Sequence, residues 1–110
     1  MAEIKNAIVL SADIFVEDHG LLTSFLTLDY GDGGQQGFGG YVLLAPRAED
    51  PLRSNCGLWV WRVLHVAGVE RWSQLPGRVV RVEVDDHVGI EAIGHAVRDV
   101  WFRPRAEFGP

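Results

Sequence analysis

Two short segments place carboxylates beside an imidazole: Glu17-Asp18-His19 and Asp85-Asp86-His87. Such groups can hold a divalent cation or transfer a proton near neutral pH. Adjacent residues seldom all point at one ion, however, and neither segment has the i, i+4 histidine spacing of a helical zinc site. We interpret both as turns, where Asp and His are common because they tolerate unusual φ angles and bond the nearby backbone. The sequence therefore predicts no metal and no cofactor.

A glycine-rich segment is the second candidate, because residues 31–40 contain six glycines. Backbone N–H groups freed from side-chain crowding can cradle an anion. The segment lacks the Lys-Ser/Thr ending of a phosphate-binding loop, and a short strand at residues 41–45, rather than a helix, is predicted to follow it. We favour a connection whose glycines serve packing or a subunit contact. The alternative is a small-molecule or nucleotide-signal site formed by Gly37, Phe38, Gly39, Gly40, Tyr41 and His95.

Catalytic side chains are harder to find. His65 and His95 lie within a predicted helix and a predicted strand, where an imidazole bonded to a backbone carbonyl is the more common situation. The serines lack the glycine-rich turn that exposes a nucleophile, and Cys56 lies at a predicted helix start. The sequence thus predicts a protein that is not an enzyme. A small enzyme that uses His95 and a carboxylate is the alternative.

Charge is divided unevenly between the two halves of the chain. The 110 residues carry 15 acids and 10 bases, a net charge of −5, which argues against gripping a nucleic-acid backbone. Residues 1–50 hold eight of the acids and two of the bases. This acidic half can meet a basic surface on a partner protein, although a solvated acidic face is the simpler interpretation. The candidate contacts are Asp13, Glu17, Asp18, Phe25, Asp29 and Asp32.

Hydrophobic periodicity predicts the elements that position these residues. Alternation over residues 4–16 and 21–30 predicts a long antiparallel hairpin, with one buried face in the first strand formed by Ile4, Ile8, Leu10, Ala12, Ile14 and Val16. A helix is expected from Ser54 or Asn55 to Ala67, where Gly68 follows. Its apolar stripe is predicted at Leu58, Trp61, Leu64 and His65, and it is widened by Val60 and Val63. A short helical turn is expected within residues 70–75, and residues 78–84 and 88–97 predict a second hairpin.

We therefore expect an α+β fold in which residues 1–110 form a single domain. It consists of a mostly antiparallel sheet of about five strands, two hairpins plus a short strand, with one main helix packed on one face. Trp101-Phe102 should be docked, and the tail after it loose. One cysteine and no apolar run near the ~20 residues of a membrane span predict a cytoplasmic protein. Four tryptophans in so small a chain predict a two-fold homodimer.

Several short motifs carry a family resemblance. Asp18-His19-Gly20, Leu28-Asp29-Tyr30-Gly31, Gln36-Gly37-Phe38-Gly39-Gly40-Tyr41 and Ala92-Ile93-Gly94-His95, with Trp101-Phe102, resemble a group of small bacteriophage and prophage proteins of mostly unknown function. The glycine block is the most specific of these motifs. The resemblance covers nearly the whole chain and implies no catalytic residue.

What the resemblance implies is a class of function. Small, acidic phage proteins without enzyme motifs often bind a host factor, and many inhibit host defence, as anti-CRISPR proteins do. The leading hypothesis is therefore a non-enzymatic inhibitor in the bacterial host cell. Its partner is expected to be a host protein, possibly a nucleic-acid-binding defence effector, with no direct contact to nucleic acid or membrane.

Overall fold

The computed structural model describes residues 2–18, 20, 22–31, 34–39, 56–85, 87 and 89–108. Six strands and one main helix are found among them, so the α+β class is confirmed and the strand number is six rather than five. The strands are β1 (Ala2–Val16), β2 (Leu22–Asp29), β3 (Gln35–Gly39), β4 (Val79–Asp85), β5 (Gly89–His95) and β6 (Trp101–Phe102). The helices are α1 (Cys56–Ala67), the 3-10 turn η2 (Trp72–Gln74) and α2 (Pro104–Phe108). The strand expected at residues 41–45 lies outside the described residues.

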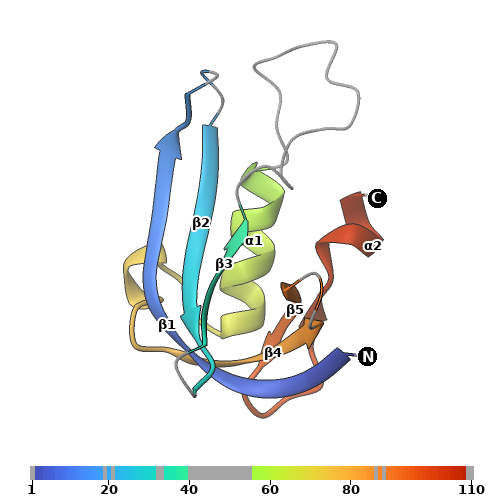
Figure 1. Cartoon of the computed structure of the whole chain (residues 1–110). Coiled ribbons are helices and arrows are strands. Elements are labelled where there is room, and N and C mark those ends of the chain that lie inside the picture. Colours follow the sequence, from blue (N-terminus) through green and yellow to red (C-terminus); the bar gives the residue numbers. More distant parts are fainter. Residues whose placement is uncertain are drawn as a thin grey trace.

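The sheet consists of two antiparallel meanders placed side by side. Its strand order is β3-β2-β1-β4-β5-β6, so the first three strands and the last three are each consecutive in the chain. The long strand β1 joins them: Ala2 to Ile8 pair with β4, and Ile8 to Val16 pair with β2. Figure 1 shows β1 bending strongly between these halves, with α1 on one side of the sheet. We call the face toward α1 the inner face and the opposite one the outer face.

The predicted buried face of the first strand is wrong except at Ala12, because Leu10, Ile14 and Val16 are exposed as well as Ile4 and Ile8. Ala7 and Val9 are buried, whereas Ile4 and Ile8 are exposed. The even set is the more apolar there, because the odd set contains Glu3 and Lys5. The register with β4 overrides this pattern, since Ala7 pairs with Val80, which is buried. A β-bulge at Leu10, where the register shifts between Val9 and Ser11, then moves the inner face to the even residues. Ala12 accordingly packs against the core.

Helix α1 begins and ends close to the predicted positions but buries a different stripe. Gly68 ends it with φ +73 and an N–H bond to the Leu64 carbonyl of 3.0 Å, the usual glycine C-terminus. Its buried residues are Cys56, Trp59, Val63, Val66 and Ala67. The predicted stripe is wrong at His65, which is exposed, and at Leu58 and Trp61, which are 52% and 57% exposed. It is confirmed at Val63, which is buried, and in part at Val60 and Leu64, which pack against the core. The helix is apolar on two adjacent stripes, and the one that carries Trp59 fills the bend of the sheet.

Aromatic rings close the core between the helix and both meanders. The Trp59 ring lies 5.4 Å from Phe38 of β3 and 6.5 Å from Phe102 of β6, centroid to centroid. Phe38 and Phe102 are themselves 6.1 Å apart in an edge-to-face arrangement. The sheet therefore wraps around α1, and its edge strand β3 approaches the second meander, formed by β4, β5 and β6. The Gln36 side-chain oxygen of β3 accepts a 3.0 Å hydrogen bond from the Ile90 N–H of β5.

The C-terminal segment is docked, as expected, at Trp101-Phe102. The prediction of a loose tail after it is wrong for residues 104–108, which form α2. The Arg62 Nε of α1 donates to Glu107 Oε2 of α2 at 3.1 Å. On the outer face, Trp101 lies against Gly94, where an added Cβ would come within 2.7 Å of the indole ring. Within the described ranges, no helix is both long and apolar enough to cross a membrane.

Candidate protein-binding surface

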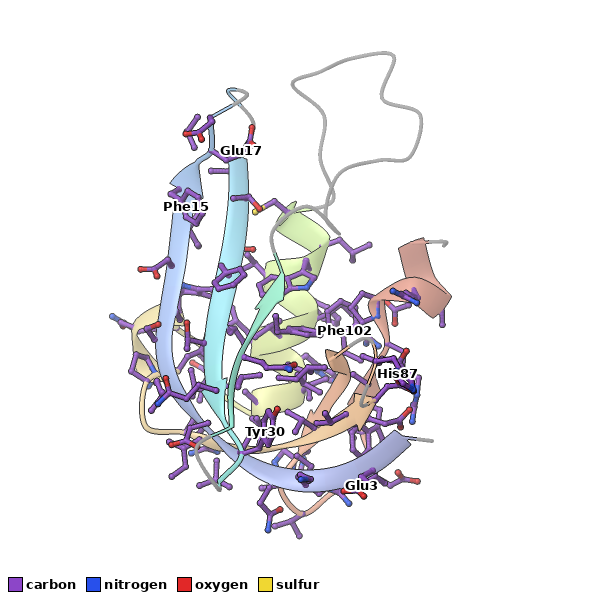
Figure 2. All side chains as sticks on the ribbon, viewed as in Figure 1. Glu3, Phe15, Glu17, Tyr30, His87 and Phe102 are labelled. Carbon is purple, nitrogen blue, oxygen red and sulfur yellow. The ribbon has the colours of Figure 1, made fainter. Side chains whose placement is uncertain are left out.

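The end of the β1–β2 hairpin exposes several large apolar side chains. We call residues 13–18 together with Leu22 the hairpin tip. Ile14, Phe15, Val16 and Leu22 are 46%, 45%, 66% and 48% exposed. In register, Ile14 pairs with Ser24 and Val16 with Leu22, so Ile14, Val16 and Leu22 share the inner face. Phe15 lies on the outer face, and Figure 2 shows its ring projecting from β1 on the side away from α1.

The start of α1 explains why the inner face of the tip is uncovered by the helix. The Cys56 thiol, in the first residue of α1, lies 3.5 Å from the Ser24 hydroxyl and donates to it. Ser24 is buried, whereas its cross-strand partner Ile14 and the next pair on the inner face, Val16 and Leu22, are exposed. The described helix thus reaches as far as Ser24, and the hairpin continues beyond it (Figure 1).

The hairpin tip is also acidic. Asp13, Glu17 and Asp18 belong to it, and the chain has no Lys or Arg between Lys5 and Arg47. Asp13 and Asp18 are exposed, and Glu17 stands at the end of the hairpin in Figure 2. The Glu17 carbonyl accepts the Gly20 N–H at 2.8 Å, which forms the turn. The exposed apolar side chains of the tip are therefore accompanied by three carboxylates, with no Lys or Arg nearby in the sequence.

The other predicted contact residues are only partly gathered with this tip. Phe25 is the cross-strand partner of Asp13 and lies on the outer face, half-buried, with its ring over Gly37. Asp29 lies at the opposite end of β2, where its carboxylate accepts the Gly31 N–H at 2.9 Å. Asp32 lies outside the described residues. The structure thus brings Asp13, Phe25, Glu17 and Asp18 to one half of the hairpin and leaves Asp29 at the other.

The predicted ligand-binding residues do not form one group among the described residues. Gly37, Phe38 and Gly39 belong to β3 instead of a loop, and the Phe38 side chain is buried in the core. Gly40 and Tyr41 lie outside the described residues. His95 ends β5, whereas β3 meets β5 at its beginning, through Ile90. The small-molecule alternative stays a prediction, with no observation here that favours it.

The imidazole of His95 has a structural environment. Its Nδ1 accepts the N–H groups of Val97 and Arg98, each at 3.0 Å, and its Nε2 lies where an added Cβ on Gly68 would be 3.3 Å away. The ring thus organises the turn after β5 against the end of α1. It is bonded to backbone N–H groups rather than to the carbonyl that we expected.

The two turns that combine acids with histidine use local hydrogen bonds where they are described. The Asp85 carboxylate accepts the His87 N–H at 2.8 Å, which is an Asx-type turn. His19 and Asp86 lie outside the described residues. Within the described part of the chain, no group of three or more His, Cys, Asp or Glu side chains could hold a metal ion.

A basic and aromatic cluster on β4 and β6 is satisfied internally. The guanidinium carbons of Arg81 and Arg103 lie 5.0 Å and 5.3 Å from the Trp101 ring centre. Arg103 also pairs with Glu83 at 3.1 Å, and the Trp101 indole N–H bonds Asp99 at 3.1 Å. These contacts hold the C-terminal segment on the sheet.

No protein-family model, curated protein or solved structure matches the chain. Function has to be inferred from the hairpin tip itself.

Proposed function

We propose that this chain is a non-enzymatic, protein-binding inhibitor whose hairpin tip occupies a basic surface of its partner. The observation that carries the proposal is the tip's composition and exposure together. Single exposed apolar residues are normal on a protein surface, but a contiguous group with a polar rim is typical of an interaction site. Here Ile14, Phe15, Val16 and Leu22 are all about half exposed or more, over both faces of the hairpin end, and Asp13, Glu17 and Asp18 lie beside them in the chain.

The charge of the tip favours one kind of partner. Acidic side chains around an apolar centre attract a basic surface over several ångströms, speed the encounter, and disfavour acidic proteins. The resemblance to small phage proteins makes a host defence effector the partner to test first. Such a protein holds nucleic acid on a basic surface, which the acidic tip can occupy in place of the phosphates.

A matched set of variants tests this proposal. Phe15→Ser with Val16→Ser removes the two apolar groups that lie at the end of β1, and Asp13→Asn with Asp18→Asn removes charge at the same place. Leu58→Ser with Trp61→Ser is the control, because these residues are equally exposed on α1. Each protein is used to capture partners from a bacterial host lysate and is expressed in cells that carry an active defence system.

We expect the wild-type chain and the α1 control to capture the same host protein and to weaken defence. Both tip variants should lose capture and restore defence, and salt should weaken capture by the wild type. The proposal is overturned if the tip variants behave as the wild type does, or if the wild type captures nothing and leaves defence intact. Thermal unfolding of every variant checks that a loss is not caused by unfolding.

A further inference from the structure

Among the described residues, the second half of β1 has a backbone edge with which no strand pairs. Strand β4 pairs with it only as far as Ile8. The Val9 N–H then donates to the Arg78 carbonyl at 2.9 Å, and its carbonyl accepts the Gly77 N–H at 2.7 Å. Pro76 precedes these residues and has no N–H to continue the ladder. In the part of the chain that the structure describes, no strand pairs with Leu10 to Val16 on the side away from β2 (Figure 1).

The ladder geometry shows which backbone groups point out of this edge. The Tyr30 N–H donates to the Gly34 carbonyl on the β3 side. The backbone N–H and C=O groups of the even residues of β2 are therefore directed toward β3, and those of the odd residues toward β1. The β1 residues opposite these odd residues are Ser11, Asp13 and Phe15, and their backbone groups are directed toward β2. The backbone groups of Ala12, Ile14 and Val16 are directed outward, away from β2.

This edge has little of the protection that isolated strand edges usually carry. Proteins block such edges with lysines, prolines, bulges or a covering segment, because a free edge is a template for another strand. Between Ser11 and Val16 there is no Lys or Pro, and Asp13 is the one charged residue. The bulge at Leu10 precedes this stretch rather than interrupting it. Its side chains at Ile14, Phe15 and Val16 are about half exposed or more.

We propose that an extended segment of the partner protein adds to the sheet along residues 11–16 of β1, with apolar residues alternating with Lys or Arg. The inference rests on the function proposed above and specifies how the hairpin tip binds. Residues that face one another across neighbouring strands share a face. On the inner face an added strand meets Ile14 and Val16, which select apolar side chains. On the outer face it meets Asp13, which selects a base.

The same charge argues against a second copy of this chain as the occupant. Pairing two β1 edges about a two-fold axis would place two acidic tips together, without a Lys or Arg between residues 6 and 46 to neutralise them. Like charges on neighbouring strands are destabilising. Strand addition by a basic segment instead supplies both the backbone partners and the opposite charge.

A peptide of defined pattern is the probe for this inference. It is a blocked, fluorescent peptide of about nine residues in which Val or Ile alternates with Lys, a length that spans the edge at ~3.3 Å per residue. A control peptide has the same composition in two blocks. Two further versions carry backbone N-methyl groups on one alternating set of residues or on the other, because methylation removes the N–H donor without changing the charge.

We expect the alternating peptide to bind at least about tenfold more tightly than the block peptide. Methylation of one set should weaken binding by about tenfold or more, since it removes several ladder bonds, and methylation of the other set should change it little. In NMR spectra of the full chain, the amide signals of Ala12, Ile14 and Val16 should shift and exchange more slowly. Those of Ser11, Asp13 and Phe15 are already bonded to β2 and should change less.

A variant of the chain gives an independent test. Ile14→Pro removes an outward N–H but no bond to β2, and Ile14→Ala removes the same apolar side chain while keeping the N–H. The proline variant should bind the peptide about tenfold more weakly than the alanine variant. If the proline disturbs the hairpin, as far-ultraviolet circular dichroism would show, the two methylated peptides still test strand addition on the unaltered chain.

Equal effects of the two methylated sets, or equal binding of the alternating and block peptides, overturn strand addition. The proposed function survives that result if the tip variants still lose the host protein, and falls with it if they do not. Amide shifts at Ala12, Ile14 and Val16 that grow with protein concentration alone also overturn the inference, because the occupant is then a second copy. A homodimer through another surface, which composition predicts, would leave these signals unchanged.

Discussion

At the scale of single residues, His95 is the clearest case of a chemically versatile side chain with a defined structural task. Its Nδ1 accepts two backbone N–H groups, from Val97 and Arg98. An imidazole that accepts through Nδ1 carries its proton on Nε2 when neutral, and this nitrogen faces the end of α1 near Gly68. The ring thus joins the turn after β5 to the C-terminus of the helix.

We expect His95→Ala to lower the free energy of unfolding by about 1–2 kcal/mol, because two hydrogen bonds are lost where water can partly replace them. His95→Asn offers an acceptor near the position of Nδ1 and should recover part of this loss. Urea denaturation of the three proteins measures both effects. An unchanged stability in His95→Ala, accompanied by loss of an activity, would instead support the enzyme alternative.

Residue identity made some of these roles predictable and others not. Asp85 and Gly68 are in the turn and helix end that their types predict, because each acts on its own neighbours in the chain. Which side of β1 is buried depends on residues far along the sequence, and Ala7 and Val9 look no more apolar than Ile4 and Ile8. The bulge at Leu10 leaves no sequence signal that separates it from continuous alternation.

At the scale of elements, α1 carries two apolar stripes and uses one of them for the core. Trp59 is fully buried among Phe38, Phe102 and Trp72, whose ring lies 5.9 Å away. Trp61 is exposed and stacks on His65 with 5.1 Å between ring centres. The helix could be predicted from its apolar periodicity and from the glycine that ends it, but its orientation could not, because either stripe could have faced the sheet.

The two tryptophans therefore give a matched comparison. We expect Trp59→Ala to cost about 3–5 kcal/mol, since it leaves a cavity at the centre of the core. Trp61→Ala should cost less than about 1 kcal/mol, because its ring is mostly in water. Thermal or urea unfolding of both variants measures the difference. Similar losses in the two would mean that the exposed stripe is covered in solution.

Strand β3 forms within the glycine-rich segment, where the glycine content alone predicts a loop. Its glycines lie beneath or beside neighbouring groups that leave no room for a side chain. The Phe25 ring covers Gly37, and a Cβ on Gly39 would lie 2.4 Å from the Ser24 carbonyl oxygen. An aromatic side chain over a glycine on the next strand compensates for the missing contacts of the glycine. Local propensity cannot anticipate this compensation.

Gly39→Ala should destabilise the protein more than Gly20→Ala does. Both glycines have positive φ, +123 and +80, so both variants bear a backbone cost of roughly 1–2 kcal/mol. Gly39→Ala adds a clash with a backbone oxygen, worth about 1–3 kcal/mol, whereas nothing lies within 4 Å of a Cβ at Gly20. Chemical denaturation tests the order, and equal losses would contradict it.

At the scale of the whole molecule, a side chain joins the two meanders where the sheet wraps around α1. Gln36 of β3 reaches the Ile90 N–H of β5, and Gly89 leaves space for it, since a Cβ there would lie 2.5 Å from the Gln36 oxygen. The class of fold was predictable from periodicity and turn residues. This wrapping was not, because it depends on the bend of β1 and on contacts between residues more than fifty positions apart.

Replacing Gln36 should loosen this junction without unfolding the protein. Gln36→Ala leaves the Ile90 N–H without its acceptor, which should cost about 1–2 kcal/mol and speed hydrogen exchange at that amide. Gln35→Ala is the control, because Gln35 is exposed in the same strand. Exchange at Ile90 that is equally slow in all three proteins would show that the junction is held by other contacts.

The division of β1 between two meanders has a consequence for the order in which the chain can fold. Its second half finds β2 within a few residues, so the first hairpin can form as soon as residues 8–29 have left the ribosome. Its first half must wait for β4, which begins at Val79. Throughout that interval Ala2 to Ile8 are unpaired and their apolar side chains are uncovered, so chaperone capture of nascent chains should concentrate there until the second meander is complete.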